Sequence, residues 1–216
     1  MTRPRVVLAT GNREKLAELT RILAAARVAV TLATLADFPG APDVRETGAT
    51  FAENALLKAR AIAAFTGLPA IADDSGLCVD ALNGMPGVLS ARWAGRHGDD
   101  EANLRLVLAQ LADVPEGRHG AQFACSAALA LPAGREHVTE GLMRGRIVPG
   151  PRGSNGFGYD PIFVADPAER AAAGLPAAAP GAEPTNGELS PADKDRMSHR
   201  GKALRAMAPV IAAWCL

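Results

Sequence analysis

The stretch "IADDSGLCVD", residues 71–80, places two adjacent aspartates between two short apolar runs. We expect a buried strand to end at Asp73 and Asp74, and a second strand to follow Ser75 and Gly76. Two ionised carboxylates at the rim of a core repel each other, so they require a nearby cation or hydrogen-bond donors. By itself the stretch favours a solvated turn, because Asp-Ser-Gly is common in turns. A metal site is the alternative.

The composition indicates a globular protein with a core of its own. The 216 residues suffice for one large domain or for two lobes that share a sheet. A formal net charge of zero argues against binding of nucleic-acid polymers, so an anionic ligand would need a local cluster of cations. No apolar run is long enough to span a bilayer, and the first strand begins too early for a signal peptide. We therefore expect neither a membrane nor a polymer as partner.

Cysteines and lysines are few and widely spaced. Three cysteines without a CxxC pair predict reduced, buried thiols in a cytoplasmic protein, not a disulfide framework or a zinc site. Of the 23 basic residues most are arginines, which suggests that lysines persist where a compact ammonium group is needed. The lysines are Lys15, Lys58, Lys194 and Lys202.

Helical and strand-like patterns alternate at first, and longer strand-like runs follow. Predicted helices span 13–26, about 51–65 and 99–114, and two more begin at Ser190 and Ser198. Further predicted strands span 5–10, 120–131 and 136–148. We expect a mixed α/β sheet in a single two-lobed domain over 1–216, with a flexible Ala- and Pro-rich insertion at 165–187. Pro209 should kink or end the last helix.

Two local patterns indicate charged ligands. Residues 10–12 join a strand to a helix, where backbone N–H groups and the helix dipole can bind an anion, although an ordinary turn explains them equally well. Thr50 and Glu53 have capping-box spacing at the start of the next helix. On that helix Asn54 and Lys58 are four residues apart and therefore share a face.

Six phrases in a fixed order carry a stronger signal. They are "LATGNREK" (8–15), "ETGATFAENALLKA" (46–59), "PAIADDSGL" (69–77), "MPGVLSARWAG" (85–95), "GFGYDPIF" (156–163) and "SHRGKAL" (198–204). In this order they resemble the inosine triphosphate pyrophosphatase family, which hydrolyses aberrant purine nucleoside triphosphates. The resemblance extends from about residue 5 to 208, apart from 165–187 and a stretch around 113–119.

The resemblance implies a fold and a reaction. The fold is an elongated mixed sheet flanked by helices, in two lobes with a central nucleotide-binding cleft, and the protein is a homodimer. The reaction converts ITP, dITP or XTP and water to the nucleoside monophosphate and pyrophosphate, with Mg²⁺ as cofactor. Expected metal ligands are Glu46, Asp74 and Asp73. Expected substrate contacts are Thr10, Gly11, Asn12, Arg13, Glu14, Lys15, Asn54, Lys58, Ser75, Phe157, Gly158, Tyr159, Asp160, Lys194, His199 and Arg200.

The residue chemistry agrees with these roles. Lysines and Mg²⁺ together would neutralise a triphosphate without a basic surface. We expect Asp74 to be the catalytic acid, which orients or deprotonates the attacking water, and Asp73 to be a supporting or metal-linked residue. His199 and Arg200 can donate to the oxygen at C6 of an aberrant purine, while Phe157 offers a stacking face.

Simpler interpretations stay open at this point. The Ser-His-Arg sequence can be a helix cap followed by exposed basic residues, and Tyr159 can pack inward from its loop. Other functions to weigh are a related pyrophosphatase for modified pyrimidines and a nucleotide-binding regulator without catalysis. A polymer-binding protein is disfavoured by the zero net charge and the few aromatic residues.

Overall fold

The computed structural model describes residues 3–10, 13–179 and 181–215, without the side chains of Arg13 and Glu14. The chain forms two compact units. Unit 1 comprises Met1–Asp74, Cys125–Gly141 and Arg200–Leu216, and unit 2 comprises Ser75–Ala124 and Leu142–His199. No helix in the described ranges is long and apolar enough to cross a membrane.

Six strands form one mixed sheet in the order β2-β1-β3-β4-β5-β6. They are β1 (Arg5–Leu8), β2 (Thr31–Thr34), β3 (Ala70–Val79), β4 (Gly120–Ala130), β5 (Glu136–Ile147) and β6 (Phe163–Ala165). Strand β1 runs parallel to β2 and β3, whereas β6 is antiparallel to β5. The predicted mixed α/β sheet is therefore confirmed.

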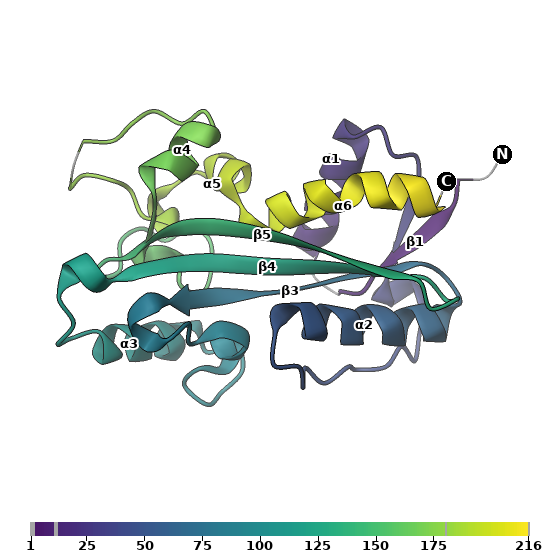
Figure 1. Cartoon of the computed structure of the whole chain (residues 1–216), viewed down its shortest axis with the longest axis horizontal. Coiled ribbons are helices and arrows are strands. Elements are labelled where there is room, and N and C mark those ends of the chain that lie inside the picture. The colour runs from purple at the N-terminus through teal and green to yellow at the C-terminus, as the bar shows by residue number, and fades with distance from the viewer. Residues whose placement is uncertain (1–2, 11–12, 180, 216) are drawn as a thin grey trace. The chain divides into compact units, whose positions relative to one another are not determined.

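Among the described residues, six α-helices accompany the strands, and Figure 1 labels them. They are α1 (Arg13–Ala25), α2 (Phe51–Thr66), α3 (Asp100–Gln110), α4 (Pro167–Ala172), α5 (Pro191–Met197) and α6 (His199–Cys215). The predicted start of α2 is confirmed, because the Thr50 side chain accepts a hydrogen bond from the Glu53 N–H (3.1 Å). Gly67 ends this helix with a positive φ of 66°, a conformation that glycine adopts without steric cost.

In unit 1 the strands are covered on both faces. Figure 1 shows α1 and α6 on one side of the strands and α2 on the other. Along β1, Val6 and Leu8 pack in the cluster that includes α1 and α6, while Val7 packs in the cluster that includes α2. Alternate residues thus serve opposite faces, which explains why the three residues that follow Arg5 in β1 are all apolar.

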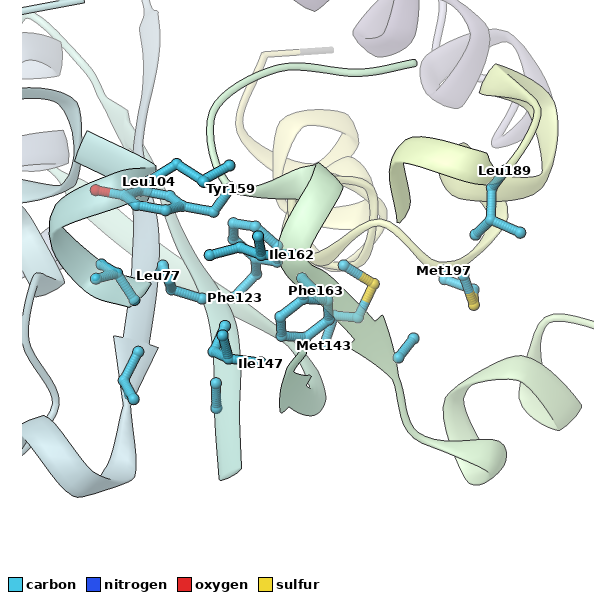
Figure 2. Packing of buried hydrophobic residues seen from close by; sticks show 14 of the residues in the cluster. Leu77, Leu104, Phe123, Met143, Ile147, Tyr159, Ile162, Phe163, Leu189 and Met197 are labelled. Atoms are coloured by element: carbon cyan, nitrogen blue, oxygen red, sulfur yellow. The ribbon is translucent and has the colours of Figure 1, made fainter. Parts of the chain in front are cut away.

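Unit 2 has a separate core (Figure 2). The rings of Phe123 and Phe163 are tilted against each other with centroids 4.7 Å apart. Leu104 from α3 and Met197 from α5 join the same cluster, so helices distant in sequence share one core. Burial of each large side chain contributes about 1.5–3 kcal/mol.

The expectation of two strands separated at the aspartates is wrong. Strand β3 continues from Ala70 to Val79, so Asp73 and Asp74 lie inside it, and neither a strand end nor a solvated turn forms there. Both side chains are buried, with 5% and 9% exposure. A strand can carry two buried aspartates because each finds donors on a different helix.

Two other expectations need correction. Helix α6 continues past Pro209 to Cys215, so the proline does not end it, and a kink at Pro209 stays a prediction. The missing N–H removes one helical bond, while the buried Met207 and Ile211 hold both sides of the proline in the core. Segment 165–187 is not without structure, since α4 begins at Pro167. Its flexibility stays a prediction.

Candidate functional site

The two aspartates of β3 point to opposite faces of unit 1. Successive side chains of a strand alternate, so Asp73 and Asp74 cannot face the same helix. The Lys15 ammonium of α1 donates to Asp73 Oδ2 (2.5 Å), and the Asn54 amide of α2 donates to Asp74 Oδ2 (2.9 Å). Because α1 and α2 lie on opposite sides of the strands, each aspartate has a partner set of its own (Figure 1).

Asp73 is an ionised carboxylate in a buried position. Burial alone would raise the pKa of Asp73, but the charge and hydrogen bond of Lys15, together with the charge of Arg200, outweigh burial and lower it below its ordinary value. Asp73 therefore holds the Lys15 ammonium in place. Its role as a supporting residue in the reaction stays a prediction.

Lys58 of α2 lies between two carboxylates, those of Glu46 and Asp74. Its ammonium donates to Glu46 Oε1 (2.6 Å) and lies 4.0 Å from Asp74 Oδ1. The sequence pattern placed Asn54 and Lys58 on one helical face, and both indeed reach Asp74. The carboxylates of Glu46 and Asp74 and the Lys58 ammonium thus gather beside β3.

Glu46 and Asp74 form a donor set that suits Mg²⁺. This ion prefers carboxylate oxygens and commonly takes one or two of them, leaving the other positions to water and substrate phosphates. Within the described ranges, no group of three or more His, Cys, Asp or Glu side chains could hold a metal ion. The three predicted metal ligands therefore do not form one cluster, because Asp73 turns toward Lys15 on the opposite face.

Arg200 has a buried acidic partner, Glu18, which sequence reasoning missed. Its guanidinium donates to Glu18 Oε2 from Nε (2.6 Å), and Nη2 lies 2.5 Å from the same oxygen. Burial would lower the pKa of Arg200, but the Glu18 carboxylate outweighs burial and raises it. Glu18 is 5% exposed and follows Lys15 by one turn of α1, and that spacing was the signal available in the sequence.

In unit 2, Asp160 organises the glycine-rich loop. The Phe157 N–H donates to Asp160 Oδ2 (2.8 Å), which also accepts from the Lys194 ammonium. The Asn186 amide donates to the other carboxylate oxygen (3.2 Å). The Lys194 ammonium in turn lies 4.7 Å from the centroid of the Phe157 ring, a cation–π contact.

Phe157 is exposed and Tyr159 is buried, although they are two residues apart. Phe157 is 60% exposed, which leaves its ring available for stacking. Tyr159 lies in the core of unit 2 (Figure 2). Its hydroxyl donates to the Ser90 carbonyl oxygen (2.8 Å). The simpler interpretation of an inward-packed tyrosine is therefore correct. Asp100 of α3, which sequence reasoning missed, accepts from the Gly158 N–H (2.8 Å).

His199 and Arg200 are adjacent but belong to different units. In unit 2 the His199 ring is stacked on Phe123, with centroids 5.0 Å apart and planes 13° apart. Both side chains are partly buried, so the interpretation as exposed basic residues after a helix cap is wrong. Their contact with a base stays a prediction.

The remaining predicted substrate contacts are only partly described. Gly11 and Asn12 lie outside the described residues, and so do the side chains of Arg13 and Glu14. Thr10 lies two residues after the end of β1 and is half-buried, and its N–H donates to the Leu8 carbonyl (2.8 Å). Substrate contact at these positions, and at Ser75 within β3, is still a prediction.

Known proteins resemble this chain along nearly its whole length. The model of the Ham1 family matches residues 6–210. Proteins named dITP/XTP pyrophosphatase are 54% identical over 207 residues in Streptomyces coelicolor (96% of each chain) and 55% identical over 214 residues in Nocardia farcinica (99% of this chain, 97% of that one).

Two solved structures also resemble this chain. The nucleoside-triphosphatase, or dITP/XTP pyrophosphatase, of Mycobacterium abscessus has a TM-score of 0.77 at 51% identity and covers 96% of this chain and 99% of its own. A HAM1 protein from Coxiella burnetii has a TM-score of 0.83 at 39% identity, with coverage of 99% and 100%. The chain belongs to the Ham1 family.

Proposed function

We infer that this chain hydrolyses aberrant purine nucleoside triphosphates, namely ITP, dITP and XTP, to the nucleoside monophosphate and pyrophosphate. Relatives more than 50% identical over almost the whole chain bear the name dITP/XTP pyrophosphatase. The observation that carries the inference is the buried Asp74 carboxylate, which the Asn54 amide and the Lys58 ammonium hold beside Glu46. Such a cluster suits hydrolysis of a phosphoanhydride bond by an activated water.

Mg²⁺ dependence is part of the proposal. Glu46 and Asp74 would hold the ion, which when bound neutralises phosphate charge and makes a phosphorus atom more electrophilic. The carboxylates of both residues supply the hard oxygen donors that this ion requires.

The residues of the chain have separate tasks in the reaction. Asp74 accepts a proton from water as the water oxygen attacks the α-phosphorus. The bond from the α-phosphorus to the bridging oxygen breaks, and pyrophosphate leaves with the electron pair. The ammonium groups of Lys15 and Lys58 neutralise charge that develops on the phosphates.

Base selection is assigned to residues near the end of the chain and to the glycine-rich loop. His199 and Arg200 donate to the C6 oxygen of hypoxanthine or xanthine, whereas adenine presents an amine there and would leave donor facing donor. The exposed ring of Phe157 offers a stacking face for the base. We also propose that the protein acts in the cytoplasm as a homodimer, and sedimentation velocity would test the oligomeric state.

Product analysis tests the function. ITP, dITP, XTP, GTP, ATP and dUTP are incubated with the protein in Mg²⁺ or in EDTA, and pyrophosphate and orthophosphate are measured separately. We expect Mg²⁺-dependent pyrophosphate from ITP, dITP and XTP, and little from GTP or ATP. Orthophosphate as first product would refute the cleavage site, and equal rates on all purines would refute the assigned base selection.

A further inference from the structure

Asn54 is fully buried on α2, and both ends of its amide are hydrogen-bonded. The Gly48 N–H donates to Asn54 Oδ1 (2.7 Å), and Asn54 Nδ2 donates to Asp74 Oδ2 (2.9 Å). The first bond holds the segment that precedes α2 and contains Glu46. The second holds a side chain of β3. The Asn54 amide thus links the segment that contains Glu46 to strand β3, which contains Asp74.

The orientation of this amide follows from its surroundings. A backbone N–H can only donate, so the atom that faces Gly48 must be the amide oxygen. The nitrogen then faces Asp74 and donates to its carboxylate oxygen. The alternative orientation would place two donors against each other and leave Asp74 facing an oxygen.

The backbone approaches Asn54 too closely for any other residue at position 48. A Cβ atom at Gly48 would lie 2.8 Å from Asn54 Oδ1 and 2.6 Å from Glu53 Cβ. Such distances are shorter than van der Waals contact, so a side chain would displace the segment. Glycine at position 48 is therefore part of the same arrangement.

We propose that Asn54 is a positioning residue, which sets the placement of Glu46 relative to Asp74 and does not bind the substrate. The proposal rests on the function and the metal ligands proposed above. It replaces the expectation that Asn54 contacts the nucleotide, because Asn54 is fully buried and its amide oxygen and nitrogen each bond to a group of the protein.

The two roles predict different measurements for Asn54→Ala. A positioning residue behind metal ligands typically changes metal affinity or activity by about 10- to 100-fold. We therefore expect Mn²⁺ to bind the free protein about 10-fold or more weakly by electron paramagnetic resonance, and kcat to fall while the nucleotide KM at saturating metal stays within about twofold. A substrate contact would instead raise the nucleotide KM and leave Mn²⁺ binding unchanged, which would overturn the proposal.

Two further variants cover the case in which Asn54→Ala does not fold. Gly48→Ala disturbs the same hydrogen bond from the other side and should also weaken Mn²⁺ binding. Glu53→Ala is the matched control, because Glu53 is exposed and accepts from Ala49 in the same segment (2.6 Å) without reaching Asp74. This control should leave Mn²⁺ affinity within about twofold.

The outcomes separate this proposal from the proposed function. Mn²⁺ binding to the free protein needs no substrate, so it tests Asn54 even if the wild-type protein releases no pyrophosphate. Weaker Mn²⁺ binding in Asn54→Ala and Gly48→Ala, with the control unchanged, supports the proposal. Unchanged Mn²⁺ binding in both variants, or an equal loss in Glu53→Ala, overturns it.

Discussion

Each unit contains a buried aspartate that accepts from a lysine, but the two pairs are built differently. In unit 1, Asp73 lies within the regular strand β3 and its partner Lys15 lies on α1. In unit 2, Asp160 follows a glycine-rich loop and its partner Lys194 lies on the short helix α5. The first pair depends on two long elements that the core already holds. The second helps to shape the loop that contains it.

The surroundings of the two pairs follow the same difference. Asp73 accepts a hydrogen bond from Lys15, and the next residue of β3 is Asp74. Asp160 instead accepts hydrogen bonds from a backbone N–H and from Asn186 in addition to Lys194. An aspartate in a strand has its direction set by the sheet, whereas a loop aspartate gains a fixed direction only from several donors.

The largest effect on activity is expected from a change at Asp74, which follows Asp73 in β3. Asp74→Asn removes the proposed proton acceptor while it keeps the shape of the side chain, so kcat should fall by about 10²–10⁴-fold. Nucleotide binding should largely survive, since Lys15 and Lys58 remain. Steady-state kinetics with XTP and equilibrium binding measure the two quantities. A near-normal kcat would show that Asp74 is not the catalytic acid.

Asp73→Asn should act chiefly on stability. The change removes the carboxylate that neutralises Lys15, and loss of one partner of a buried pair costs about 3–5 kcal/mol in free energy of unfolding. Lys15 is 23% exposed, so the cost should lie near the lower end. Urea unfolding measures it. A loss below about 1 kcal/mol would mean that the pair behaves like an exposed one.

The same variant tests the pH dependence of stability. The folded pKa of Asp73 lies below its ordinary value, so its contribution is complete above the unfolded pKa and is lost as the pH falls through the folded pKa. Urea unfolding from pH 7 down to pH 3 should show a steeper loss in the wild type than in Asp73→Asn. Parallel curves would contradict the lowered pKa.

In unit 2, Lys194→Met should weaken substrate binding more than catalysis. It removes the ammonium beside the Phe157 ring, so we expect the nucleotide KM to rise about tenfold with kcat changed less. Lys194→Arg is the matched control, which keeps the charge and should recover part of the affinity. An unchanged KM in the Met variant would separate Lys194 from the substrate.

Tyr159→Phe should have the smallest effect. It removes the hydrogen bond to the Ser90 carbonyl and should cost about 1 kcal/mol in free energy of unfolding, with kcat/KM unchanged. Burial, with a smaller effect of Asp100, raises the pKa of Tyr159, so its hydroxyl should add no step to a pH–rate profile. A tenfold fall in kcat/KM would restore Tyr159 to the substrate contacts.

Periodicity alone predicted much of the secondary structure. The predicted starts of α1 and α2 and the predicted long strands 120–131 and 136–148 correspond to elements in the structure. The pattern failed at β3, because polar residues inside a strand resemble a turn when their partners are distant in sequence. Lys15 is 58 residues from Asp73, and no local rule connects them.

The sequence by itself determined the family, the mixed α/β class and the shared face of Asn54 and Lys58. These depend on motif order and on helical spacing, which are local properties. Only the tertiary structure decided that Asp73 and Asp74 face different helices, that Tyr159 is buried, that Glu18 pairs with Arg200, and that Asp100 accepts from the Gly158 N–H. Those facts depend on which distant elements pack together, and packing is set by the whole core and not by any one segment.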